Sequence, residues 1–137
     1  MIARVIGSIV FLRGIYASVL FLSVFLFKIG LANPLIISGH FGDFVQALPY
    51  WIFLPWGAYV AGYVIAGVLT IRRRVNGLWV FIAAMVLDFS LWIYSSMSTR
   101  IDLIWSGTAP MIEVAFNILD MFLAVSLIIL FRMGRLR

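Results

Sequence analysis

The 137-residue chain is 65% hydrophobic and 11% charged, whereas an average soluble domain is about half apolar and about 25% charged. With a mean hydropathy of +1.16, it is expected to fold in lipid as an integral membrane protein. No cysteine and a single histidine exclude disulfides, thiolate metal sites and a bis-histidine haem built by this chain alone, so we expect no cofactor. The net charge of +5 does not indicate nucleic acid, because the basic residues lie beside the apolar runs.

The first apolar run predicts a transmembrane helix over about 14–32, retained in the protein rather than cleaved as a signal peptide. An apolar leader, residues 1–12, precedes it; this leader carries Arg4 and is followed by Arg13. We expect the leader to be either the early turns of one long tilted helix or a short helix in the interface, since an arginine can snorkel in both. Asn33-Pro34 is expected to end the first span.

The connection over 33–49 is mostly apolar, which is unusual for a solvated loop. We expect it to lie flat in the outer interface; the alternative is a re-entrant segment that dips into the membrane. His40 and Asp43 lie three residues apart in this connection and could hold a metal ion if the segment is helical. One histidine and one carboxylate make a weak site, so no metal is expected.

The second span is predicted over about 50–71, between an aromatic belt and the basic run 72–74. Small residues recur in it at every fourth position and would allow another helix to approach its backbone, although chance could also produce this pattern: Ala58, Gly62 and Ala66. Three aromatic residues share another face, which serves core packing or could bind an aromatic or quinone-like ligand: Trp56, Tyr59 and Tyr63.

A short turn over 75–77 requires the third span, about 78–96, to return antiparallel, and the fourth span follows over about 110–131. Lys28 and Arg100 are the basic residues on one side of this arrangement, against eight on the other: Arg4, Arg13, Arg72, Arg73, Arg74, Arg132, Arg135 and Arg137. The positive-inside rule then predicts a four-helix transmembrane bundle with both termini cytoplasmic, in a cell membrane such as the bacterial inner membrane. The basic rim is expected to attract anionic lipid headgroups.

Two acids, Asp88 and Asp120, are predicted about 16 Å from the cytoplasmic boundary at about 1.5 Å per residue, and therefore near the midplane. An aspartate at that depth costs roughly 2.5 to 3.5 kcal/mol on insertion scales, which makes the pair a candidate functional site. We expect no lysine or arginine of this chain at their depth. Glu113 and Asn117 precede Asp120 on the same helical face and would extend it into a polar stripe.

Three features favour a small subunit or assembly component that acts by helix packing in the membrane, as a homo-oligomer or with a larger membrane protein. These are the lack of a soluble domain, the small-residue face, and acids with no evident partner in the chain. The alternative is a small proton- or cation-coupled transporter or channel that uses Asp88 and Asp120. A membrane enzyme is the least supported class, because no nucleophile, metal set or phosphate-binding loop is visible.

Overall fold

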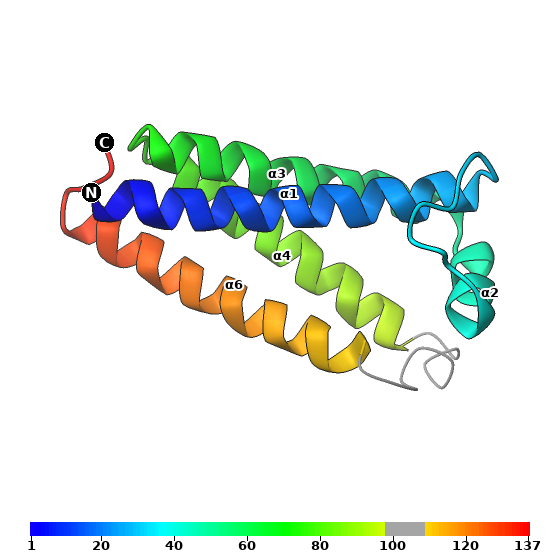
Figure 1. Cartoon of the computed structure of the whole chain (residues 1–137). Coiled ribbons are helices and arrows are strands. Elements are labelled where there is room, and N and C mark those ends of the chain that lie inside the picture. Colours follow the sequence, from blue (N-terminus) through cyan, green and yellow to red (C-terminus); the bar gives the residue numbers. More distant parts are fainter. Residues whose placement is uncertain (98–108) are drawn as a thin grey trace.

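The structure, a computed structural model, describes residues 1–97 and 109–137 (Figure 1). Within these residues the regular structure is entirely helical: α1 (Ile2–Lys28), α2 (Gly39–Ala47), the 3-10 helix η1 (Tyr50–Ile52), α3 (Phe53–Ile71), α4 (Asn76–Met97) and α6 (Ala109–Arg132). Helix α1, the joined η1 and α3, α4 and α6 are each long and apolar enough to cross a membrane. The expected all-α class with four candidate spans is confirmed, and it is compatible with a multi-pass membrane protein.

Helix α1 differs from its predicted bounds at both ends. It begins at Ile2, so the apolar leader and the first span form one continuous helix, and Arg13 lies near its middle. It ends at Lys28, before the predicted stop at Asn33-Pro34, because Gly30 takes a left-handed backbone conformation (φ +72°). The Gly30 amide then donates to the carbonyl oxygen of Phe27 over 3.0 Å, the kind of bond that closes the last turn of many helices.

Helices α1 and α3 run side by side along their lengths, in contact through backbone atoms (Figure 1). A Cβ atom placed on Gly7 would lie 2.6 Å from the backbone nitrogen of Ile71, and one on Gly14 would lie 2.7 Å from that of Val64. Gly67 of α3 meets the backbone of Phe11 in the same way. Only glycine allows helices to approach this closely, so these positions set how α1 lies on α3.

Two of the three small residues predicted to pack against another helix do so against α4 of the same chain. Gly62 faces Ala84, whose Cβ would lie 2.9 Å from a Cβ placed on the glycine, and Ala66 is fully buried. Ala58 is exposed.

Both termini and the α3–α4 turn lie at one end of the bundle (Figure 1). The carboxyl-terminal residue is tied to this turn: the Arg137 amide donates to the Arg73 carbonyl over 2.7 Å, and the Val75 amide donates to the Arg137 carbonyl over 2.9 Å.

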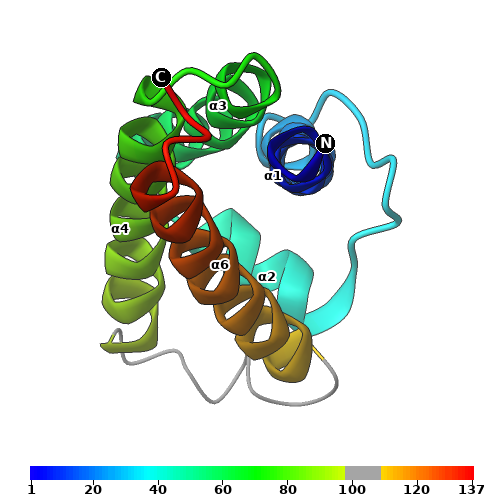
Figure 2. The ribbon, with the colours of Figure 1, turned by 90° about the vertical axis from the view of Figure 1, so that its left-hand side faces the viewer.

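Helices α4 and α6 slant away from the α1–α3 pair toward the opposite end, where α2 lies (Figures 1 and 2). Helix α2 packs its Val45, which is fully buried, against the ends of α1 and α3. The Lys28 ammonium donates to the carbonyl oxygen of Gln46 and lies 4.9 Å from the centre of the Tyr50 ring, which ties the end of α1 to the end of α2. The connection is therefore a folded part of the bundle, and its depth in a membrane stays a prediction.

Candidate functional site

Four polar side chains meet inside the bundle, one from each long helix. Arg13 comes from α1, Tyr63 from α3, Asp88 from α4 and Asp120 from α6, and each lies near the middle of its helix. The close glycine contacts between α1 and α3 bring Arg13 and Tyr63 to the same level. We call these four residues the charged cluster.

Arg13 and Asp120 form the most complete contact of the charged cluster. The guanidinium donates from Nε to Asp120 Oδ1 over 3.2 Å and from Nη2 to Oδ2 over 3.0 Å, in the two-bond geometry that suits arginine and carboxylate. The same Nη2 lies 3.4 Å from Asp88 Oδ2, a longer contact. Asp120 therefore holds the arginine, and Asp88 shares it at greater distance.

The Tyr63 hydroxyl lies between the two acids, 3.0 Å from Asp120 Oδ2 and 3.1 Å from Asp88 Oδ2. The ring of Tyr63 also lies against the guanidinium, whose carbon is 5.0 Å from the ring centre; the ring of Phe116 is 4.6 Å away. Contacts of this kind favour a cation over the face of an aromatic ring. Arg13 is thus engaged both through its hydrogen bonds and through aromatic contacts.

Burial separates the two acids. The side chain of Asp120 is 2% exposed, whereas that of Asp88 is 17% exposed. One guanidinium balances one carboxylate, and a phenol has a single proton that it donates to one acceptor at a time. With both acids ionised, the charged cluster has one uncompensated negative charge, and Asp88 is the member with the longer ion contact and the greater exposure. Asp88 is therefore the less compensated of the two acids.

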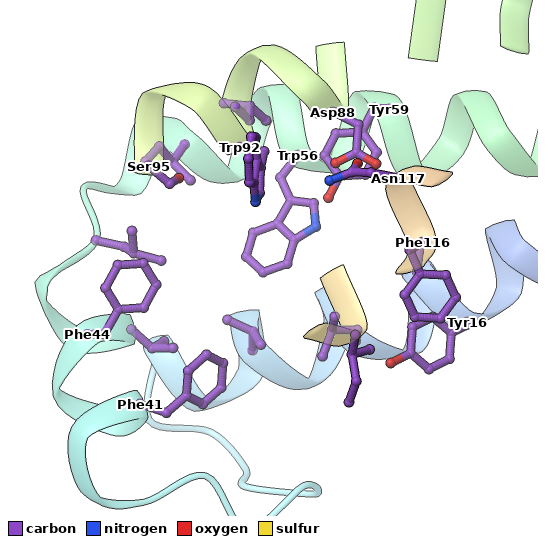
Figure 3. A pocket seen from close by; sticks show the side chains of 18 of the residues that line it. Tyr16, Phe41, Phe44, Trp56, Tyr59, Asp88, Trp92, Ser95, Phe116 and Asn117 are labelled. Atoms are coloured by element: carbon purple, nitrogen blue, oxygen red, sulfur yellow. The ribbon is translucent and has the colours of Figure 1, made fainter. Parts of the chain in front are cut away.

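A cavity of about 230 Å³ adjoins Asp88 (Figure 3). Its lining includes Arg13 and Asn117 next to the acid, and residues of α2 contribute to its far end. Five aromatic side chains from all four long helices line it as well: Tyr16, Trp56, Tyr59, Trp92 and Phe116. The cavity is thus a largely apolar space, with several aromatic side chains in its wall and a carboxylate at one end.

The expectation that no basic residue lies at the depth of the acids is wrong, because Arg13 contacts both of them. That expectation took Arg13 as the boundary of a span that began at Gly14. One sequence signal could have corrected it: Ala3, Gly7, Gly14 and Ala17 are small residues at helical spacing on both sides of the arginine, and all four are buried. A packing face that passes through Arg13 indicates a helix that passes through it too.

The other predicted site residues lie at different places. Trp56, Tyr59 and Asn117 line the cavity, and Tyr63 belongs to the charged cluster. Asp43 is exposed on α2. The side chains of His40 and Glu113 lie outside the described part of the structure, in which there is no group of three or more potential metal ligands. Comparison of the chain with protein families, curated proteins and solved structures gives no match.

Proposed function

We propose that this chain is a small proton- or cation-coupled membrane transporter or channel. In this proposal Asp88 is the binding carboxylate, and Asp120 holds Arg13, the cation that both acids contact. The observation that carries the proposal is that two carboxylates share one guanidinium beside a cavity. Ionisable groups within membrane spans are costly and often mark ion or proton pathways. An ion pair that served only to lock the helices together would not need a second acid facing the cavity.

Occupancy of Asp88 would change the forces between α4 and α6. While both acids are ionised, Asp88 and Asp120 repel each other and compete for Arg13 Nη2 and for the Tyr63 hydroxyl. When a proton or cation neutralises Asp88, both donors become available to Asp120 and the repulsion disappears. A ligand that binds one arrangement of the helices better shifts the population toward that arrangement. Binding at Asp88 is therefore coupled to the relative positions of α4 and α6.

The rival proposal, a subunit that acts by helix packing with another membrane protein, loses two of its three supporting features. The acids have partners within the chain, and Gly62 and Ala66 face the chain's own α4. The apolar composition of these 137 residues remains, and it is equally expected of a transporter. The transport proposal therefore has the stronger support.

Proton or cation flux into proteoliposomes tests the proposal directly. Purified protein would be placed in vesicles that contain a pH-sensitive or a potassium-sensitive dye, and a pH or potassium gradient would be applied. We expect wild-type flux above that of empty vesicles and its loss in Asp88→Asn, since an amide neither ionises nor takes up a proton. Asp43→Asn is the matched control, because it makes the same change at an exposed acid on α2 and should leave flux unchanged.

Two results would overturn the proposal: a wild-type protein with no flux of protons or monovalent cations, or flux that survives in Asp88→Asn. Gel filtration of each variant in mild detergent shows whether it is still folded. If the wild type conducts nothing and the double variant Asp88→Asn/Asp120→Asn also dissociates from a co-purifying protein, the subunit proposal replaces this one.

A further inference from the structure

We infer that the cavity binds a small lipophilic organic cation, of about one aromatic ring, with its positive charge at Asp88. This inference rests on the proposed function in taking Asp88 as the binding carboxylate. It goes further in assigning the shape and chemistry of what the carboxylate binds. Three observations support it: the volume of the cavity, the side chains of its wall, and the contacts of the two charged residues that line it, Arg13 and Asp88.

The volume of the cavity suits a small molecule. At about 230 Å³, the cavity exceeds the roughly 150 Å³ that holds a benzene molecule in an engineered protein cavity. It is smaller than the roughly 300 to 1,000 Å³ of pockets for drug-sized ligands. An inorganic ion would leave most of this space empty, whereas one ring that carries an ammonium group would fill it.

The wall suits a cation with an apolar body. Trp56 and Tyr59 of α3, Trp92 of α4, and Tyr16 of α1, which stacks on Phe116 at a centroid distance of 4.8 Å, surround the space next to Asp88 (Figure 3). Aromatic faces attract ammonium groups, and tryptophan does so best. The same faces provide apolar contact for the ring of the ligand.

An anionic ligand is disfavoured even though Arg13 also lines the cavity. The guanidinium makes two hydrogen bonds to Asp120 and lies against the rings of Tyr63 and Phe116, so it is already engaged. An anion there would lie beside two carboxylates of like charge. Asp88, in contrast, is the more exposed acid and holds the charge that the arginine does not balance.

The test measures binding of benzyltrimethylammonium, which has one ring and a fixed positive charge, to the full chain in lipid nanodiscs by calorimetry. Neopentylbenzene, its uncharged carbon analogue, serves as the neutral probe, and empty nanodiscs correct for partition into lipid. We expect saturable binding of the cation and weaker binding of the neutral probe. Asp88→Asn should weaken cation binding by about thirtyfold or more, since it removes one partner of a buried charge pair. Asp43→Asn should not change it.

A second variant keeps the test valid if Asp88→Asn fails to fold. Trp92→Leu keeps the wall apolar but removes one aromatic face, without touching the charged cluster. It should weaken binding of the cation by up to about tenfold and leave binding of the neutral probe nearly unchanged. Equal affinity for the cation and the neutral probe, or cation binding that neither variant weakens, would show that the inference is wrong.

The flux and binding measurements separate the two proposals. If flux depends on Asp88 but benzyltrimethylammonium does not bind, the ligand is a proton or an inorganic cation, and only the present inference fails. If the organic cation binds through Asp88 but no flux is detected, the site is a binding site and the transport function fails.

Discussion

Arg13 lies where a bilayer would make a lone charge costly, and its contacts show how the chain compensates for it. An arginine at the centre of a span costs roughly 2.5 to 3.5 kcal/mol on insertion scales. Its side chain is 8% exposed, and the guanidinium donates to both aspartates and lies against two aromatic rings. The pairing is mutual, because each aspartate would carry a similar cost without the arginine.

Replacement of Arg13 by glutamine is expected to destabilise the protein by about 3 kcal/mol. The change leaves two carboxylates close together with no cation, and the loss of one partner from a buried ion pair costs about 3 to 5 kcal/mol. We take the lower end because the acids can take up protons. Unfolding of the purified protein by SDS in mixed micelles measures the effect, and Arg4→Gln, an exposed arginine on the same helix, is the control.

The triple variant Arg13→Gln/Asp88→Asn/Asp120→Asn should regain most of this stability, because neutral hydrogen-bonding groups then replace all three charges. If the triple variant is as unstable as Arg13→Gln alone, the arginine contributes through its packing rather than through its charge.

At the scale of the helices, local signals predict some ends and tertiary contacts decide others. Helix α3 ends at Ile71, directly before the basic run, and α6 begins at Ala109, next to Pro110, so residues beside these ends mark them. The start of α1 has no such marker. The small-residue face of α1 indicates that the helix continues through Arg13, but the acids that compensate the charge of Arg13, Asp88 and Asp120, are 75 and 107 residues away in sequence. A single sequence shows the two acids as a candidate site, but it does not show which cation they face.

The backbone contact between α1 and α3 predicts that substitutions at two neighbouring positions, Gly7 and Ser8, differ strongly in their effect on stability. Gly7→Leu would place a side chain within the contact with Ile71 and Thr70, whose backbone atoms lie 2.6 to 3.0 Å from the Cβ position. Overpacking of this kind costs about 1 to 3 kcal/mol. Ser8→Leu adds comparable bulk on the exposed side of the same turn and should change the stability little. Thermal unfolding followed by circular dichroism compares the two, and equal melting temperatures would contradict the contact.

The whole molecule has a strong asymmetry of charge between its two ends. Seven arginines belong to the segments at the end that holds both termini: Arg4, Arg72, Arg73, Arg74, Arg132, Arg135 and Arg137. Arg13, counted with them from the sequence, lies inside the bundle instead. The remaining seven still favour a cytoplasmic position for this end by the positive-inside rule, and they still predict attraction to anionic headgroups.

Single cysteines test this orientation cleanly, because the chain has no cysteine of its own. Arg135 and Asp43 are exposed at opposite ends of the bundle. A maleimide that does not cross membranes should label Asp43→Cys in intact cells and should label Arg135→Cys only after the cells are permeabilised. The reverse pattern would place the termini outside.

The position of Arg13 also affects the order in which the helices can reach their final positions during synthesis. Helix α1, which carries the cation, leaves the ribosome before α4 and α6, which carry its counter-ions. Until then α1 must rely on its apolar surface, with a mean hydropathy of 2.2 in its most apolar stretch, to offset the charge. We therefore expect α1 to reach its full stability only when α6, which carries Asp120, has been made.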